Sequence, residues 1–250
     1  CDRNRFDSLY LYEKNMKLDL CPSPALYPHY KSDHDTVIVV DVFRASATMC
    51  TMLNNGASAI IPVSSIDEAR TYKSEGYLVG AERKTQKCDF ADFGNSPFDY
   101  SPEKVKDREV VFTTTNGTRA IEAASDCREL LIGTFINVDA LVERCINTAE
   151  RVVILCAGWN NRISIEDTLF GGVFAEKAME KSNVEFDSDS IRMTLELWNR
   201  VKNDLMGYIE LSDHYRRLVD NGAVSDAAYC LTQNSMSVVP VYNKSDGKIY

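Results

Sequence analysis

The sequence predicts an α/β fold in which a mostly parallel sheet is covered by helices on both faces. Short apolar runs rich in β-branched residues, such as TVIVVD at 36–41, EVVFTT at 109–114 and RVVILC at 151–156, have the length and composition of buried strands. Amphipathic stretches of helical length separate these runs. Strands that alternate with helices are typical of parallel sheets, because parallel neighbours need a long crossover connection. The 250 residues suffice for one large domain of this kind.

The expected elements follow one another in a regular order. We expect strands near 17–21, 36–41, 58–63, 77–81, 109–114, 129–133, 151–156 and 237–242. The helices expected between them lie near 45–55, 66–75, 117–125, 138–148 and 165–181. A helix-rich stretch near 188–232 precedes the last strand. In this stretch we expect Gly222 to end one helix and Ser225 or Asp226 to cap the next.

The chain is expected to fold as a single domain over residues 16–250, because no low-complexity linker divides it. Residues 1–15 are polar and show no apolar periodicity, whereas Met16 begins a stretch that reads like a natural start. We therefore expect residues 1–15 to be an extension outside the folded domain.

Composition and charge limit the classes of partner. The net charge of -9 and the absence of a long basic run argue against nucleic acid, whose phosphates need clustered Lys and Arg. No apolar run has the length of a membrane span, and no signal peptide is visible. The eight cysteines include no CxxC pair, so we expect buried, reduced thiols rather than a zinc ribbon. These features predict a cytoplasmic protein.

Polar residues follow four of the predicted strands at the point where each strand ends. Because the carboxyl ends of parallel strands share one edge of an open sheet, these side chains should converge there and form a ligand site. The residues are Asp41 and Arg44, then Glu82 and Arg83, then Thr114, Thr115, Asn116 and Arg119, and finally Gly158, Glu166 and Asp167.

The collected chemistry is that of a metal-assisted phosphoryl transfer site. Several carboxylates together suit Mg2+, which prefers oxygen ligands. Arginines form forked hydrogen bonds with phosphate or sulfonate oxygens, and amides at helix starts bind anions. The alternative is a module that binds a phosphorylated metabolite without turnover. The acids favour the enzyme, because carboxylates repel an anion unless a metal neutralises them.

Two of the acids also have structural interpretations. Asp41 precedes an expected helix and is a suitable cap for it. Asp167 follows Ser164 by three residues, which resembles a capping box. For Asp167, capping and metal binding are equally compatible with the sequence.

The other candidates have structural interpretations as well. Arg44 and Arg83 have the alternative of surface ion pairs. Asn116 and Gly117 fit a type I′ hairpin turn, although the helical pattern of 118–124 favours a strand-to-helix turn.

Cys156 is the nucleophile of an alternative mechanism. It ends a predicted strand, and Arg162 follows six residues later, which matches the Cys-x5-Arg spacing of cysteine-dependent phosphatases. The intervening AGWNN lacks the repeated glycines of that phosphate-binding loop. Catalysis by the acids is therefore preferred over a cysteinyl nucleophile.

Five ordered blocks resemble the 2-phosphosulfolactate phosphatase family, the Mg2+-dependent acid phosphatases of coenzyme M biosynthesis. They are DVFRASAT (41–48), GAERKTQKCDFADFGNSP (80–97), TTTNGTRA (113–120), CAGWNNRISIEDTLFGG (156–172), and HYRRLVDNGAVSDAAYC (214–230) followed by VVPVY (238–242). The segment from Gly158 to Glu166 departs from the family pattern, because it is rich in asparagine rather than glycine.

The resemblance implies a three-layer α/β/α fold peculiar to the family, with a mostly parallel or mixed sheet, and a homodimer. It implies Mg2+-dependent hydrolysis of a small anionic phosphate ester, 2-phosphosulfolactate, to sulfolactate and phosphate. The sequence leaves open whether water or a carboxylate such as Asp41 attacks phosphorus.

With this resemblance, we assign the candidate residues to three roles. The catalytic candidates are Asp41, Arg44, Glu82, Asn116 and Arg119. The substrate-binding candidates are Arg83, Asn95, Ser96, Thr115, Gly117 and Gly158, with Arg83 expected to hold the carboxylate or sulfonate. The metal candidates are Asp41, Glu82, Glu166 and Asp167.

Overall fold

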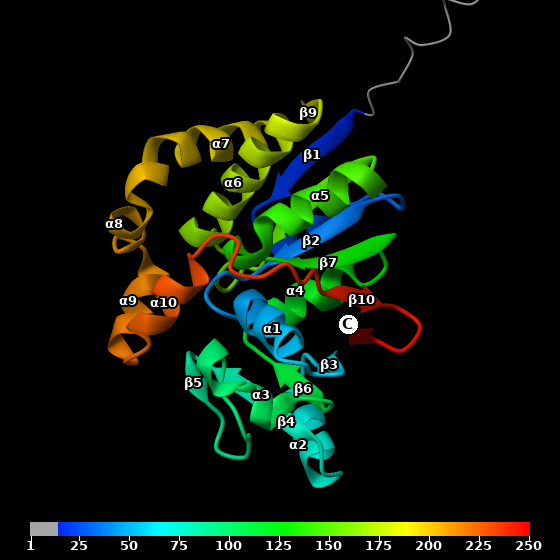
Figure 1. Cartoon of the computed structure of the whole chain (residues 1–250), viewed down its shortest axis with the longest axis vertical. Coiled ribbons are helices and arrows are strands. Elements are labelled where there is room, and N and C mark those ends of the chain that lie inside the picture. The colour runs from blue at the N-terminus through cyan, green and yellow to red at the C-terminus, as the bar shows by residue number, and fades with distance from the viewer. Residues whose placement is uncertain (1–14) are drawn as a thin grey trace, which may run out of the picture.

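A computed structural model of the chain describes residues 15–250 and confirms the α/β fold. Its strands form one mixed sheet in the order β5-β4-β6-β3-β11-β10-β7-β2-β8-β1-β9. Figure 1 shows this sheet running from β9 and β1 at the top to β4 and β5 at the bottom, with helices packed on its faces. The prediction made for residues 1–15 falls almost entirely outside the described residues.

The sheet contains two groups of parallel strands. The first group consists of β1 (Met16–Cys21), β8 (Arg151–Cys156), β2 (Thr36–Val40) and β7 (Glu129–Gly133). The second group consists of β3 (Ala59–Pro62), β6 (Glu109–Thr113) and β4 (Leu78–Arg83).

A short antiparallel hairpin joins the two groups and makes the sheet mixed. Its strands are β10 (Val241–Asn243), which pairs with β7, and β11 (Lys248–Ile249), which pairs with β3. Short strands form the two edges of the sheet, namely β9 (Val184–Phe186) and β5 (Gln86–Lys87).

The helices follow the strands as crossover connections and as one C-terminal group. The crossover helices are α1 (Ala45–Asn54), α2 (Ile66–Ser74), α3 (Pro102–Val105), α4 (Gly117–Ala124), α5 (Val138–Thr148) and α6 (Ile165–Lys181). The remaining helices are α7 (Asp189–Val201), α8 (Leu205–Ile209), α9 (Asp213–Asp220) and α10 (Val224–Cys230). In Figure 1, α8, α9 and α10 lie together at the left side of the molecule.

Alternating side chains of the central strands fill two separate cores, which creates the three layers. Ile38 and Ile154 belong to the core that α5, α6 and α7 cover. Val37 and Val153 belong to the core on the opposite face, which α4 covers. This alternation follows from the strand geometry, in which successive side chains point to opposite faces. The three-layer α/β/α prediction is therefore confirmed.

Two sequence predictions in the C-terminal region differ from the structure, and one is confirmed. Gly222 follows α9 with a φ of +70°, so it does end a helix there. The N-cap of α10 is Ala223, and both Ser225 and Asp226 lie within the first turn of the helix. The Asp226 carboxylate forms a buried ion pair with Arg44. The last strand is also shorter than the predicted 237–242, since Pro240 has no amide hydrogen for a ladder bond.

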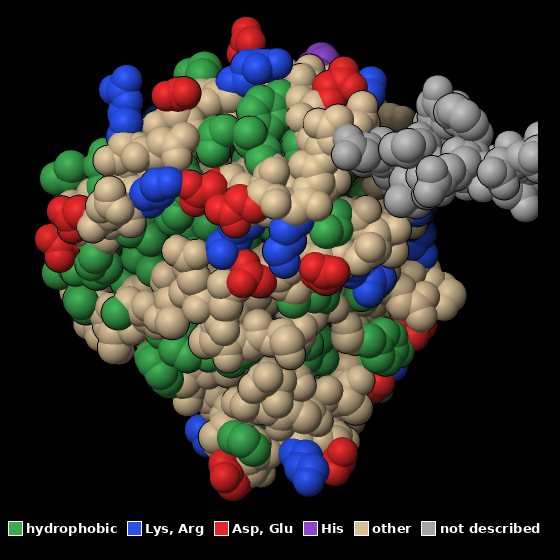
Figure 2. Space-filling model, turned by 45° about the horizontal axis from the view of Figure 1, so that its top comes forward, with side chains coloured by type: hydrophobic (Ala, Val, Ile, Leu, Met, Phe, Trp, Pro, Cys, Tyr) green, Lys and Arg blue, Asp and Glu red, His purple; other side chains and the backbone are tan. Residues whose placement is uncertain are grey.

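The described helices, the cysteines and the surface charges each bear on one of the sequence predictions. No described helix combines the length and apolar character needed to cross a membrane. The cysteines of the described residues are all free thiols, and most are buried. Figure 2 shows Lys and Arg side chains interspersed with Asp and Glu on one face of the molecule, rather than gathered in a basic patch.

Candidate active site

The carboxyl ends of strands from both parallel groups meet at a narrow cleft. Its volume is about 10 Å³, close to the space that one water molecule needs. Five of the residues that line it were predicted as site residues from the sequence, and four were not. The lining consists of Asp41, Arg44, Glu82, Asn95 and Asn116, together with Phe43, Thr85, Trp159 and His214.

Asp41 is held between the end of β2 and the start of α1. Its amide donates to Ser46 Oγ at 2.9 Å, and its carbonyl accepts from the Ser46 amide at 2.9 Å. A Cβ atom on Gly117 would lie 2.8 Å from Asp41 Oδ2, so only glycine allows this close approach. Asp41 therefore both anchors α1 and lines the cleft, although the N-cap of α1 is Arg44.

The Asp41 carboxyl group is buried beside other charged side chains. Burial raises the pKa of Asp41 to about 6. His214 lowers this pKa, while the neighbouring Glu82 and Glu166 raise it further. A pKa near the operating pH is what a general base or a titratable metal ligand requires.

Arg44 is buried in the cleft and forms an ion pair with Asp226 of α10. Arg44 Nη1 donates to Asp226 Oδ2 at 2.5 Å. The other carboxylate oxygen of Asp226 accepts from Ser96 Oγ at 3.1 Å. The surface ion pair considered for Arg44 is therefore wrong, because both partners are almost fully buried. Ser96 contacts the site through Asp226, which the sequence analysis had considered only as a helix cap.

Glu82 is fixed at the end of β4 by the turn that follows it. Its Oε1 accepts from the Thr85 amide at 2.5 Å and from Thr115 Oγ1 at 3.3 Å. Lys84 and Thr85 have positive φ values of 54° and 71°, as a tight turn requires. Thr115 thus orients a carboxylate of the cleft and does not line the cleft itself.

Two asparagines supply amide groups to the cleft. Asn116 is the N-cap of α4, so the hairpin-turn alternative is wrong. Its Oδ1 accepts from the Asn160 amide at 3.3 Å. Asn95 Oδ1 is buried without a hydrogen-bond partner among the described residues. A buried oxygen of this kind is able to accept a hydrogen bond from a ligand or water, or to bind a cation.

The two acids at the start of α6 have different surroundings. Glu166 Oε1 lies 2.6 Å from His214 Nδ1, while Glu166 Oε2 is buried without a partner in the described structure. Asp167 Oδ1 accepts from the Val42 amide at 2.8 Å, and Oδ2 accepts from the Gly158 amide at 3.0 Å. Asp167 thus joins the loops that follow β2 and β8. Burial, with Glu166 nearby, raises the pKa of Asp167 well above its ordinary value.

Neither side chain of the predicted capping box caps α6. Ser164 is the N-cap residue, but its hydroxyl accepts no hydrogen bond from the helix amides, and both Asp167 oxygens bond to other segments. The capping interpretation of Asp167 is therefore wrong.

Two predicted arginines do not line the cleft. Arg83 Nη1 donates to the Glu82 carbonyl at 2.6 Å, and Nη2 donates to Thr113 Oγ1 at 2.9 Å. Arg119 is exposed on α4. Burial lowers the pKa of Arg83, and the positive charge of Arg119 lowers it further. Neither arginine lines the cleft.

The surroundings of Cys156 disfavour a nucleophilic thiolate. Cys156 is fully buried, and burial raises the pKa of its thiol well above the ordinary value, with Asp167 adding to the effect. Reactive cysteines need a lowered pKa. The following loop closes as a tight turn between Trp159 and Arg162, in which Asn160 and Asn161 have positive φ. The amides of Trp159 and Arg162 donate to each other's carbonyls, so they are not free to bind a phosphate.

His214 and Trp159 are the most important residues that the sequence analysis missed. The centroid of the His214 ring lies 5.5 Å from that of Trp159 and 5.7 Å from that of Phe43. The three histidines of the sequence, His29, His34 and His214, have no metal-ligand spacing, so spacing alone does not identify His214. The available signal was its position at the start of one of the matching blocks, HYRRLVDNGAVSDAAYC.

The described residues contain no group of three or more His, Cys, Asp or Glu side chains arranged to hold a metal ion by themselves. Magnesium usually needs only one or two protein carboxylates, because waters and substrate phosphate complete its shell. The unpartnered Glu166 Oε2 and the Asn95 Oδ1 are oxygens of the suitable kind. The residues present thus fit a magnesium ion with few protein ligands, rather than a cage of four carboxylates.

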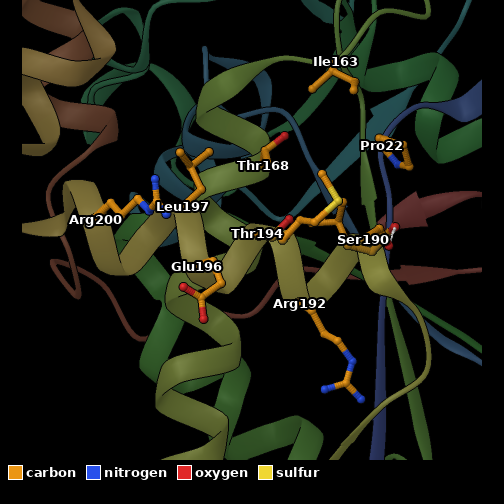
Figure 3. A pocket seen from close by; sticks show the side chains of 11 residues that line it. Pro22, Ile163, Thr168, Ser190, Arg192, Thr194, Glu196, Leu197 and Arg200 are labelled. Carbon is orange, nitrogen blue, oxygen red and sulfur yellow. Dashed lines mark hydrogen bonds between the residues drawn. The ribbon is translucent and has the colours of Figure 1, made fainter.

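A larger cavity of about 590 Å³ lies away from these acids, between α6 and α7. In Figure 3, Thr168, Thr194 and Leu197 lie together at its centre, whereas the guanidinium of Arg192 extends away from them. None of the residues predicted for the site lines this cavity. The narrow cleft is therefore the candidate active site.

The chain is similar to known proteins along most of its length. The family model described as 2-phosphosulpholactate phosphatase matches residues 21–245. A protein of Caldanaerobacter subterraneus is 35% identical over 86% of this chain and 92% of its own length. A protein of Thermotoga petrophila is 37% identical over 82% of this chain and 88% of its own length. A protein of Clostridium acetobutylicum is 32% identical over 92% of this chain and 99% of its own length.

All three relatives are described as probable 2-phosphosulfolactate phosphatases. The matched region contains every residue of the cleft. The chain therefore belongs to the 2-phosphosulpholactate phosphatase family, whose members are phosphoric monoester hydrolases.

Proposed function

We propose that the chain is a Mg2+-dependent phosphatase that hydrolyses 2-phosphosulfolactate to sulfolactate and phosphate. The observation that supports this proposal most is that the buried Asp41 carboxyl and the buried Arg44 guanidinium line the same cleft. An anionic phosphoryl group needs the arginine, and its hydrolysis needs a proton acceptor. The names of the relatives supply the substrate of the proposal.

The residues of the cleft have two roles in this proposal, which are phosphate binding and proton transfer. Arg44 holds the phosphoryl oxygens in an orientation that Asp226 fixes. The side-chain nitrogen of Asn116, whose oxygen already accepts from Asn160, adds a donor at the start of α4. Asp41 takes the proton of the attacking water on a carboxylate oxygen. As the bond between phosphorus and the ester oxygen breaks, this proton passes to the departing alkoxide, which leaves as the hydroxyl of sulfolactate. Direct attack by the same carboxylate is the other form of this mechanism.

The magnesium ion would be held by one or two of the acids Asp41, Glu82 and Glu166, with waters and substrate oxygens completing its shell. His214 Nδ1 fixes Glu166 Oε1 and leaves Oε2 as the unpartnered oxygen. The ion would neutralise the acids and withdraw electrons from the phosphoryl group. Asp167 takes a positioning role in this proposal, because both of its oxygens hold backbone amides.

The test is phosphate release from 2-phosphosulfolactate with Mg2+, with EDTA, and with Mg2+ added back. We expect activity that EDTA removes and Mg2+ restores. Full activity in the metal-free protein would contradict the metal dependence. Binding of the ester without any phosphate release would instead support the alternative of a non-catalytic binding module.

The homodimer and the cytoplasmic location stay predictions. Free thiols throughout the described residues support a reducing compartment. Light scattering tests the dimer, which should have twice the chain mass of 28.1 kDa.

A further inference from the structure

The cleft around Asp41 is too small for a complete phosphorylated hydroxy acid. Its volume of about 10 Å³ means that the rest of the ester extends into an adjoining space. A cavity of about 380 Å³, which we call the side cavity, shares Trp159 and His214 with the cleft. Glu166, Ser164, Ser212 and Arg217 also line it. The side cavity is therefore the neighbouring space into which a substrate can continue.

Within residues 15–250, Arg217 is a cation of the side cavity whose guanidinium has no hydrogen-bond partner. Its guanidinium lies 3.9 Å from the centroid of the Trp159 ring. Among the described residues it makes no hydrogen bond or ion pair, and its Nε is buried without a partner. Burial lowers the pKa of Arg217, while the acids Glu166 and Asp213 raise it. An anion in the side cavity would supply the missing partner.

The start of α6 adds a second feature that favours an anion. Ser164, only 6% exposed, has a hydroxyl with no hydrogen-bond partner in the described part of the chain. Because this hydroxyl does not cap α6, the first amides of the 17-residue helix remain free to donate. Ser212, in contrast, already accepts from the Tyr215 amide at the start of α9.

The acids of the side cavity do not cancel this preference. Asp213 has a side chain that is 86% exposed and lies 3.5 Å from Arg216, so its charge faces solvent. Glu166 Oε1 is paired with His214. The other oxygen of Glu166, Oε2, is the one whose charge the proposed magnesium ion would neutralise.

We infer that the side cavity binds the second anionic group of the substrate, a sulfonate or carboxylate, and that Arg217 is its main partner. This inference rests on the proposed phosphatase function and adds the residue that selects the substrate. It replaces the role first expected for Arg83, whose guanidinium donates to Glu82 and Thr113 instead. An ester with uncharged ends would lack this interaction.

Substrate preference tests the inference with two esters of the same carbon skeleton. 2-Phosphosulfolactate has an anionic group at each end, whereas glycerol 2-phosphate has a hydroxyl at each end. The measured quantity is the kcat/KM for 2-phosphosulfolactate divided by the kcat/KM for glycerol 2-phosphate. We expect Arg217→Gln to reduce this ratio by about 10- to 100-fold, which corresponds to the loss of a hydrogen bond to a charged group. Arg216→Gln, a change of the exposed neighbour on α9, should leave the ratio unchanged.

An unchanged ratio in Arg217→Gln would overturn the inference. If thermal melts show that this variant does not fold, Ser164→Ala should reduce the same ratio by a smaller factor, about 3- to 10-fold. An unchanged ratio in that folded variant would overturn the inference equally.

Binding measurements separate this inference from the proposed function. If the wild-type protein releases phosphate from neither ester, the proposed function fails. Calorimetric titration with sulfolactate still tests the side cavity. The inference is supported if Arg217→Gln weakens the binding of sulfolactate by about tenfold or more while Arg216→Gln leaves it unchanged. Equal affinities in all three proteins would overturn it.

Discussion

Arg44 and Asp226 form a buried ion pair between residues 182 positions apart in the sequence, with 2.5 Å between Nη1 and Oδ2. The pair connects the loop after β2 with α10, and both side chains are nearly inaccessible to solvent. Because Arg44 also lines the cleft, the C-terminal helices determine where the proposed phosphate-binding guanidinium lies.

Asp226→Asn should therefore affect both stability and substrate binding. The variant leaves the Arg44 charge buried without a counter-ion, which typically costs about 3–5 kcal/mol. We also expect a higher KM in whatever fraction is folded, since Arg44 is no longer fixed. Thermal melts and steady-state kinetics measure the two effects. Asp213→Asn, an exposed acid of α9, is the matched control. A normal melting temperature and KM in Asp226→Asn would refute the positioning role.

Cys156→Ser tests the alternative nucleophile. The buried, high-pKa thiol should contribute only to packing, so turnover per folded molecule should stay within about tenfold of wild type, or about 1.4 kcal/mol in barrier. The concentration of folded protein is measured by circular dichroism before the assay. A loss of several orders of magnitude with a normal fold would instead indicate a cysteinyl-phosphate intermediate.

The pH dependence of the reaction should report on Asp41 and on the metal together. The pKa of Asp41, raised to about 6 by burial, predicts that metal-free protein titrates this group near pH 6. Activity needs the ionised form and should fall as the pH drops through the pKa. Because a metal competes with protons for the carboxylate, Mg2+ should move this acid limb to lower pH. The measurement is kcat/KM against pH at two Mg2+ concentrations. An acid limb that does not respond to Mg2+ would exclude Asp41 as a ligand.

The sequence predicted the cleft best where a residue ends a strand. Asp41 and Glu82 were placed correctly because the carboxyl ends of parallel strands share an edge. Arg83 directly follows Glu82, and successive side chains of a strand point to opposite faces, so only Glu82 lines the cleft. Arg119 lies on an exposed position of α4 that the helical pattern alone did not identify.

The residues that the sequence analysis missed come from the C-terminal helices. His214 and Asp226 lie on α9 and α10, which reach the cleft only through tertiary packing. No local pattern predicts which face of such a helix meets a site more than a hundred residues earlier in the chain. The role of Asp167 was hidden for a similar reason, because its partners are backbone amides of two distant loops.

Phosphate release by Asp41→Asn tests the central claim most directly. Asparagine nearly preserves the shape of the side chain but removes the charge and the proton acceptor. We expect turnover of 2-phosphosulfolactate to fall by about 10²–10³ or more with an unchanged fold. Arg44→Lys, assayed in parallel, keeps the charge but loses the planar fork, so it should mainly raise KM. A folded Asp41→Asn enzyme with near-normal turnover would contradict the account and remove Asp41 from the active site.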